Sequence, residues 1–178
     1  MRVLQLLPIG GPHEPLLDWL RSELSEAFKI RCEVLSPALR PEFAFHPERG
    51  QYHSSELLGR MQQYATWKTW RLIGITPVDL YIPILTFVFG EAQMGGKCSV
   101  VSYARLRQEF YGLPADLNLL SRRLLIECIH ELGHTLELHH CDDYRCVMSS
   151  SHAVEWIDLK EQTFCVDCGA KAKMLANK

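Results

Sequence analysis

The sequence predicts a mixed α/β sandwich built as a single domain over residues 1–178. The chain has 178 residues, which is about the length of one average domain. Apolar residues make up 47 % of it, enough for a core. Strand signals come early with helical segments between them, and one long helix follows. Together these observations favour helices packed on a mixed sheet.

The N-terminal part of the chain predicts a strand, a helix, a second strand and a loop. Residues 3–9 form a largely apolar run that indicates a buried strand. Residues 15–28 carry leucines and aromatic residues at near-helical spacing, and residues 30–35 alternate enough to be a strand. Prolines and a glycine make residues 37–53 a predicted loop.

A second helix is expected after this loop. Ser54 or Ser55 can cap it, and its apolar side predicts that it runs to about Trp70. We expect three tryptophans to pack in the core or in the wall of a cleft because of their large apolar area, namely Trp67, Trp70 and Trp156.

Two strands and the long helix complete the predicted fold. Residues 86–89 (TFVF) and 98–103 (CSVVSY) are rich in β-branched and aromatic residues and predict strands. Gly95 and Gly96 mark a turn before the second of these strands. Asp116 is a candidate N-cap of the long helix, which shows an apolar face.

Charge and hydropathy exclude several classes of protein. Lysine and arginine total 19 against 21 acidic residues, which argues against binding to nucleic acid or to an anionic membrane through bulk charge. The longest mostly apolar run, residues 80–89, is shorter than the roughly 20 residues that a membrane span needs. The N-terminus indicates a first strand and not a signal peptide. We therefore expect a cytoplasmic protein. A monomer is expected as well, although no sequence motif specifies the oligomeric state.

Residues 130–134 read His-Glu-Leu-Gly-His on the predicted long helix. Four residues advance a helix by about 400°, so His130 and His134 share one face. Two imidazoles placed in this way can hold one zinc ion, and Glu131 can reach a water molecule at that ion. The alternative is a helix that carries two ordinary hydrogen-bonded histidines.

A third zinc ligand requires the helix to stop early. Catalytic zinc usually takes three protein ligands and leaves a position for water. His140 is the favoured third ligand and His139 is the alternative, but a continuing helix would point both away from the metal. We therefore expect the chain to turn back near Glu137, a position that normally needs glycine. A left-handed residue with a Cβ costs roughly 1–2 kcal/mol there, and metal binding can supply several times that.

The cysteines indicate a second metal site. Seven cysteines are an odd number, which fits poorly with a fully paired disulfide framework. A CxxxxC pair and a CxxC pair separated by 18 residues fit a closed, structural zinc site of four thiolates. Two disulfides or an iron–sulfur cluster are the alternatives. The candidate ligands are Cys141, Cys146, Cys165 and Cys168, whereas Cys32, Cys98 and Cys128 are expected to be buried thiols.

The run HELGHTLELHHCDDYRCVM, followed by FCVDC, resembles the archaemetzincins, or archaelysins, of the metzincin clan of zinc metallopeptidases. Their pattern is similar to HExxHxxGxxHC, then CxM, then a distant CxxC, and only the glycine is missing here, at Glu137. FVFGEA and VVSYARL resemble the sheet and edge-strand region of the family less specifically. The resemblance implies a twisted mixed sheet with a long active-site helix.

The resemblance also implies roles for individual residues. Catalytic zinc would be held by His130, His134 and His140, with Glu131 as general base and acid and Met148 forming a methionine turn beneath the ion. A second, structural zinc would be held within residues 141–168, giving two zinc ions per chain. Its ligands would be Cys141, Cys146, Cys165 and Cys168.

The hypothesis for function is hydrolysis of a peptide bond in a peptide or protein substrate. We expect an extended substrate to add a strand beside an edge strand around residues 98–103. Two alternatives stay open: a zinc-binding module without catalysis, and another zinc amidohydrolase or an aminopeptidase that uses the same histidines.

Overall fold

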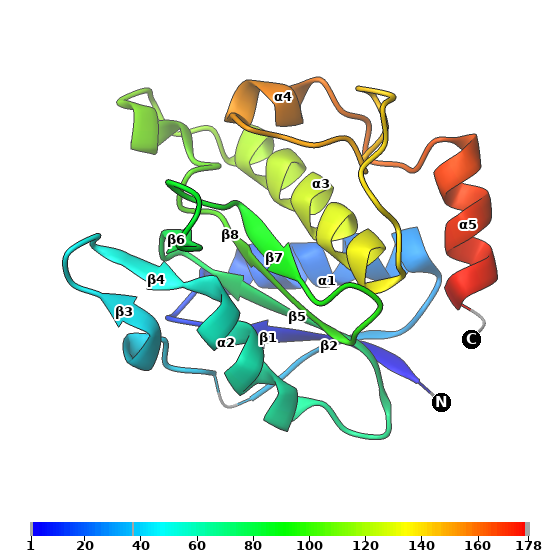
Figure 1. The fold of residues 1–178 in the computed structure, drawn as a ribbon, viewed down its shortest axis with the longest axis horizontal. Helices are drawn as coiled ribbons and strands as arrows, with labels where there is room; N and C mark the ends of the chain where they lie inside the picture. Colours follow the sequence, from blue (N-terminus) through cyan, green and yellow to red (C-terminus); the bar gives the residue numbers. More distant parts are fainter. Residues whose placement is uncertain (1, 37, 177–178) are drawn as a thin grey trace.

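A twisted five-stranded sheet forms the centre of the molecule (Figure 1). The computed structural model describes residues 2–36 and 38–176. The strand order is β2-β1-β5-β8-β7, in which the first four strands are parallel and β7 runs antiparallel to β8 at one edge. The strands are β1 (Val3–Pro8), β2 (Cys32–Val34), β5 (Thr69–Thr76), β7 (Gly90–Ala92) and β8 (Cys98–Ser102).

The two faces of this sheet are buried under different helices. Alternate side chains of the central strands, such as Leu6 and Ile73, pack in one core cluster with α1 (Glu14–Phe28) and α3 (Leu117–Thr135). The intervening side chains, such as Leu72, pack in a second cluster with α2 (Ser54–Met61). The sheet is therefore the middle layer between helices, and the predicted mixed α/β sandwich is confirmed (Figure 1).

Smaller elements complete the fold. A second sheet of order β3-β4-β6 lies beside the main one, and α4 and α5 follow α3 in the chain. No helix of the described residues is apolar over a length that would cross a membrane. The remaining elements are β3 (Phe45–His46), β4 (Gln51–His53), β6 (Leu80–Tyr81), η1 (Glu42–Ala44), η2 (Gln62–Tyr64), η3 (Gln108–Tyr111), α4 (Val154–Asp158) and α5 (Val166–Ala176).

The predicted strands at 3–9, 30–35 and 98–103 and the predicted helix at 15–28 are confirmed within a few residues. The helix expected to run to Trp70 is wrong in its extent, because α2 ends at Met61 and Thr69–Thr76 form the central strand β5. Strand β5 pairs with both β1 and β8, so tertiary pairing overrides the local helical pattern.

The serines expected to cap α2 have another role. The N-cap is His53, and no side chain caps the helix. The hydroxyl group of Ser54 instead donates to the carbonyl of Tyr81 at 3.2 Å, and both serines donate to the carboxylate of Glu91 on β7. The serines therefore connect α2 to the edge strand.

Three further expectations are wrong. Residues 86–89 do not form a strand: only Val88 makes an isolated bridge, to Leu80, and the edge strand begins at Gly90. The expected loop at 37–53 contains β3, β4 and a short 3-10 helix. Of the three tryptophans expected to be packed, Trp70 is buried, but Trp67 and Trp156 are 79 % and 51 % exposed.

Candidate metal centre and catalytic cleft

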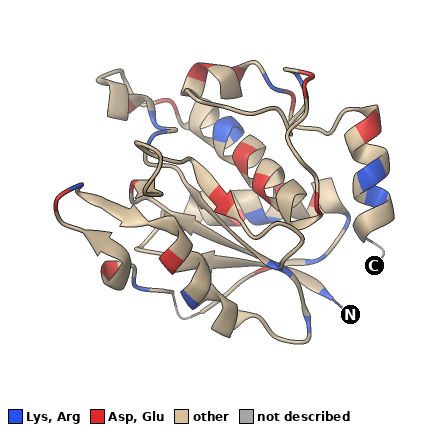
Figure 2. Cartoon of the chain, in the orientation of Figure 1, with Lys and Arg blue, Asp and Glu red and all other residues tan. Residues whose placement is uncertain are grey.

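Helix α3 positions the first two histidines. Asp116 caps it as predicted, since its carboxylate accepts a hydrogen bond from the backbone N–H of Leu119 at 2.9 Å. His130 and Glu131 are each only 5 % exposed near the C-terminal end of the helix. The two glutamates of α3 lie nearer the C-terminal end of the helix than its two arginines do (Figure 2).

Backbone carbonyls fix the orientation of both imidazoles. His130 Nδ1 donates to the carbonyl of Val147 at 2.8 Å, and His134 Nδ1 donates to the carbonyl of Leu138 at 2.7 Å. Each Nε2 atom is therefore left as an acceptor that can bind a metal. Burial lowers the pKa of His130 well below its usual value and also lowers the pKa of His134. Neutral imidazoles are the form that binds a metal.

The helix stops early enough for a third histidine to join. Helix α3 ends at Thr135, and Glu137 has φ 63°. The N–H of Leu138 donates to the carbonyl of Gly133, and the N–H of Glu137 donates to the carbonyl of His134. This is the hydrogen-bond pattern of a Schellman motif, with a glutamate where glycine is usual. The predicted left-handed turn at Glu137 is confirmed.

The turn brings His140 to the other two histidines. One ring nitrogen from each of His130, His134 and His140 lies within 4.8 Å of the others, and His139 is not part of this cluster. The Nε2 atoms of His130 and His134 are 3.0 Å apart. Two nitrogens bound to one tetrahedral zinc at about 2.0–2.1 Å lie roughly 3.3 Å apart, so the donor set fits zinc.

Glu131 lies on the cleft side of α3, against the edge strand. A Cβ atom added to Gly90 of β7 would come within 2.8 Å of Glu131 Oε1, so a glycine is needed there. Burial raises the pKa of Glu131 well above its usual value, and the charge of Glu127 one turn earlier raises it further. An elevated pKa suits a carboxylate that accepts and then returns a proton.

The histidines and Glu131 line a cleft of about 610 Å³. One wall is formed by residues 85–92, including β7, and the other by α3 and residues 150–152. Phe87 and Phe89 contribute an apolar part, with ring centroids 5.0 Å apart. The edge strand beside the cleft is β7. The expectation that residues 98–103 form this edge is wrong, because β8 is paired on both sides.

Met148 packs against Gly133 of α3. It is fully buried, and a Cβ atom on Gly133 would lie 2.3 Å from its Sδ atom. Gly133 stands between the two histidines of α3, so the close approach of Met148 needs a glycine at this position. The carbonyl of Met148 also accepts a hydrogen bond from the N–H of Cys141, which follows His140 directly. This hydrogen bond ties the backbone next to His140 to the segment that contains Met148.

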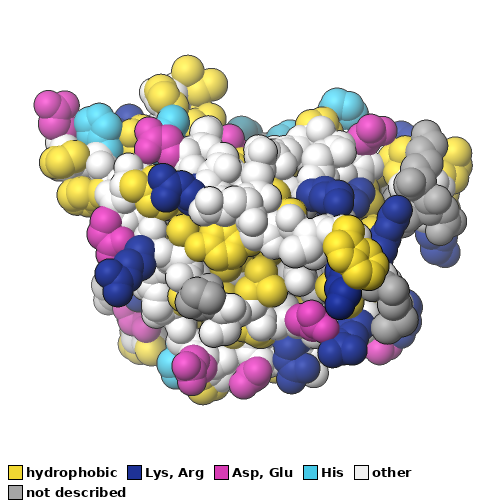
Figure 3. Space-filling model, turned by 90° about the horizontal axis from the view of Figure 1, so that it is seen from below, with side chains coloured by type: hydrophobic (Ala, Val, Ile, Leu, Met, Phe, Trp, Pro, Cys, Tyr) yellow, Lys and Arg dark blue, Asp and Glu magenta, His cyan; other side chains and the backbone are white. Residues whose placement is uncertain are grey.

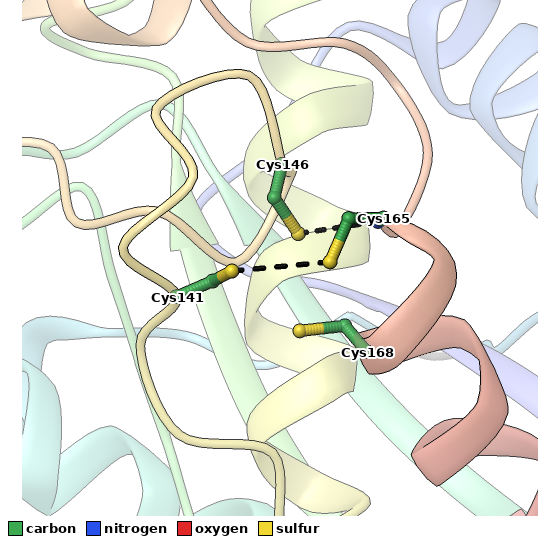
Figure 4. Close-up of side chains that lie close together, drawn as sticks. All are labelled: Cys141, Cys146, Cys165 and Cys168. Carbon is green, nitrogen blue, oxygen red and sulfur yellow. Dashed lines mark hydrogen bonds between the residues drawn. The ribbon is translucent and has the colours of Figure 1, made fainter.

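The four cysteines of the predicted second site lie together. Figure 4 shows their sulfur atoms pointing towards one another, from two loop positions and from the start of α5. All four sulfurs are within 4.8 Å of one another, and none is in a disulfide. Cys141 Sγ and Cys165 Sγ are 3.9 Å apart, against about 3.8 Å for two thiolates bound to one tetrahedral zinc at about 2.3 Å.

Burial raises the pKa of Cys146 and of Cys168, and backbone N–H groups oppose this effect at Cys146. The N–H groups of Met148 and Cys165 donate to Cys146 Sγ at 3.4 and 3.3 Å. A backbone hydrogen bond from Cys168 lowers the pKa of Cys165. The other three cysteines, Cys32, Cys98 and Cys128, are buried as expected.

Sequence reasoning missed several residues of the cleft. Glu127 lines it one turn before Glu131, which helical spacing could have indicated. Lys160 contacts Glu127 from 33 residues away, and no local pattern marks that contact. The cleft wall also contains three residues that come shortly after Met148 and belong to no recognisable sequence motif, namely Ser150, Ser151 and His152.

Comparison with known proteins decides the family. The sequence pattern of Peptidase family M54 matches residues 32–174. An archaemetzincin from Methanocaldococcus jannaschii is 40 % identical over 161 residues, which cover 90 % of this chain and 87 % of the relative. The chain belongs to peptidase family M54, the archaemetzincins.

Solved structures agree with this membership. The crystal structure of archaemetzincin from Methanopyrus kandleri superposes with a TM-score of 0.83 at 33 % identity, covering 99 % of this chain and 97 % of that one. A zinc-dependent peptidase from Methanocorpusculum labreanum gives a TM-score of 0.85 at 28 % identity, covering 95 % and 99 %. This archaemetzincin family member is a zinc-dependent metallopeptidase, and the predicted fold and activity are confirmed.

Proposed function

We propose that this peptidase hydrolyses peptide bonds at a zinc ion held by His130, His134 and His140. The convergence of three neutral imidazoles beside a buried glutamate in one cleft supports this assignment. When bound, zinc lowers the pKa of a coordinated water towards about 7 and polarises the scissile carbonyl.

Glu131 is the proposed general base and acid. Its carboxylate takes a proton from the attacking water and passes that proton to the leaving amine. Its position against Gly90 supports this role, because a peptide beside β7 would bring the scissile bond next to the carboxylate. We propose that the substrate adds to β7 through main-chain hydrogen bonds.

A second zinc ion is proposed for Cys141, Cys146, Cys165 and Cys168. Four thiolates complete a tetrahedral shell and leave no position for a substrate, so this ion is structural. It would join α5 to the segment that follows His140. The proposed organisation is one catalytic domain over residues 1–178, with the structural zinc site within residues 141–168. A cytoplasmic monomer stays a prediction.

Met148 is proposed as a packing residue under the catalytic zinc. It contacts α3 at Gly133 and not the cleft, which supports a structural role. Its proposed function is to hold the base of the site at a fixed distance from the helix that carries His130 and His134.

The test replaces Glu131 with glutamine and measures zinc content and peptide hydrolysis together. We expect Glu131→Gln to keep zinc and to lose about 10²–10⁴-fold in kcat, the usual contribution of a general base. Glu109→Gln, at an exposed glutamate outside the cleft, is the control and should behave like the wild type. Full activity in Glu131→Gln would eliminate the mechanism. Peptides with blocked and free N-termini separate endopeptidase from aminopeptidase action.

A further inference from the structure

A second cavity, of about 320 Å³, lies at the C-terminal end of α3. The turn between β7 and β8, the start of β5 and the end of α3 surround it. Three cationic side chains and one carboxylate line it: Arg2, Arg71, Lys97 and Glu137. Neither the histidine cluster nor the cysteine cluster contributes a residue to it.

None of these three cations pairs with a carboxylate in the part of the chain that the structure describes. Over residues 2–36 and 38–176, no ion pair within 4.0 Å involves Arg2, Arg71 or Lys97. Arg105, by contrast, pairs with Asp79 at 2.7 Å. Unpaired cations gathered around a cavity make its potential positive.

Three hydrogen bonds hold the guanidinium of Arg71 in place and leave some of its N–H groups free to bind a ligand. Its Nε donates to Thr135 Oγ1 at 2.9 Å, Nη2 donates to the carbonyl of Thr135 at 3.2 Å, and Nη1 donates to the carbonyl of Trp70 at 2.8 Å. A guanidinium carries five N–H donors, so others can bind a ligand. Burial, followed by the charge of Arg2, lowers the pKa of Arg71, and an anion in the cavity would oppose both effects.

The positive region continues on the surface. Trp67 is 79 % exposed at the rim of the cavity, and Lys68 Nζ lies 5.3 Å from the centre of its ring. Figure 3 shows lysine and arginine side chains concentrated on the right-hand side of the lower face, around exposed hydrophobic atoms. The cavity is thus the recessed part of a basic surface on a chain whose net charge is −2.

The basic cavity and the catalytic cleft share one hairpin. Met94 lines the cleft, whereas Gly95, Gly96 and Lys97 line the cavity. The N–H of Gly95 donates to the carbonyl of His134 at 3.0 Å, which fixes this turn to the catalytic helix. A peptide that lies along β7 and continues past Met94 therefore arrives at the cavity. At about 3.3 Å per residue, this point is roughly four to six residues from the bond beside Glu131.

We propose that the basic cavity binds acidic side chains of the peptide substrate, so that the enzyme favours substrates with Asp or Glu roughly four to six residues from the scissile bond. This inference rests on the proposed placement of the substrate along β7. Carboxylates match the planar, multidentate donors of Arg71 and the ammonium of Lys97. The exposed ring of Trp67 at the rim offers apolar contacts to the same peptide.

The experiment compares blocked peptides that share one cleavable core and carry either a Glu-rich or a Gln-rich segment. One pair has the segment before the core and the other pair has it after the core. We expect kcat/KM for the Glu peptide to exceed that for the Gln peptide by about fivefold on one side, as a few exposed ion pairs supply. High ionic strength should remove the difference.

Substitutions in the cavity test whether its cations cause the preference for the Glu peptide. Lys97→Gln and Arg2→Gln should bring the Glu-to-Gln ratio towards one. Arg40→Gln, at an exposed arginine beyond the opposite end of β1, should keep the wild-type ratio. A ratio near one in the wild type on both sides, or an unchanged ratio in both cavity variants, would overturn the proposal.

Fluorescence anisotropy with labelled Glu and Gln peptides tests binding separately from catalysis. The inactive Glu131→Gln variant should bind the Glu peptide more tightly, in a salt-sensitive manner. Equal binding of the two peptides would contradict the proposal. Cleavage of the Gln peptide that depends on Glu131 would still support the proposed peptidase mechanism, so the two ideas fail independently.

Discussion

Lys160 and Glu127 form a buried ion pair next to the catalytic cleft. Lys160 Nζ lies 3.5 Å from Glu127 Oε1, and the two side chains are 1 % and 4 % exposed. The same stretch of chain is fixed to α3 by two arginines. Arg123 binds the carboxylate of Asp158 through Nε and Nη2 at 2.8 and 2.7 Å, and Arg122 donates to the carbonyl of Lys160 at 2.6 Å. Helix α3, which carries His130 and His134, thereby fixes the position of residues 158–160.

Removing one member of this pair should destabilise the fold. Lys160→Met leaves the carboxyl group of Glu127 buried without its partner, and the free energy of unfolding should fall by about 3–5 kcal/mol. Urea denaturation of the zinc-loaded protein measures this change. The double variant Glu127→Gln with Lys160→Met removes both charges and should recover most of the loss. A single variant as stable as the wild type would show that the pair contributes nothing.

The close contact between Gly133 and Met148 predicts that no larger residue is tolerated there. Gly133→Ala would place a Cβ atom 2.3 Å from Met148 Sδ, so the free energy of unfolding should fall by about 1–3 kcal/mol, as for other overpacked cores. Gly59→Ala is the matched control, because Gly59 lies in α2 with open space around its Cβ position. That control should gain about 0.5–1 kcal/mol from helix propensity. Equal effects in the two variants would contradict the described packing.

The left-handed residue Glu137 predicts a stabilising substitution. Glycine adopts φ 63° without the cost of roughly 1–2 kcal/mol that a Cβ adds, so Glu137→Gly should raise the free energy of unfolding by about 1 kcal/mol. Glu137→Ala keeps the Cβ and should not show this gain. Denaturation curves of the three proteins decide the question. A glycine variant less stable than the alanine variant would show that the left-handed conformation of Glu137 carries no such cost.

Metal content should follow the two clusters separately. We expect two zinc ions per chain by elemental analysis, with one lost in His134→Ala and the other lost in Cys165→Ser. Cys98→Ala, at a buried cysteine outside both clusters, should keep both ions. The assignment would be wrong if either ligand variant retained two ions.

The parts of the site that sequence predicted share a local origin. The spacing of His130 and His134 follows from the helical repeat, and the capping role of Asp116 needs only the next three residues. The early end of α3 follows from requiring His140 to reach the same ion, which also places a left-handed residue at Glu137. In each case the determining residues are close in the chain.

The parts that sequence did not predict depend on distant contacts. The sequence predicts helix up to Trp70, where strand β5 has already begun. The pairing of β5 with β1 and β8 cannot be recognised from a short stretch of sequence. The strand order of the sheet places β7 at its edge. The sequence predicts β8 as the substrate edge, which is one strand too far into the sheet. The pair of Glu127 with Lys160 joins residues that only the fold brings together.

Anomalous diffraction at the zinc edge from crystals grown with zinc locates both metal sites in one experiment. We expect one peak at the Nε2 atoms of His130 and His134 and a ring nitrogen of His140, each about 2.0–2.1 Å away, and a second peak among the four cysteine sulfurs. A zinc ion bound by His130 and His134 but not by His140, or no peak at these imidazoles, would contradict this expectation.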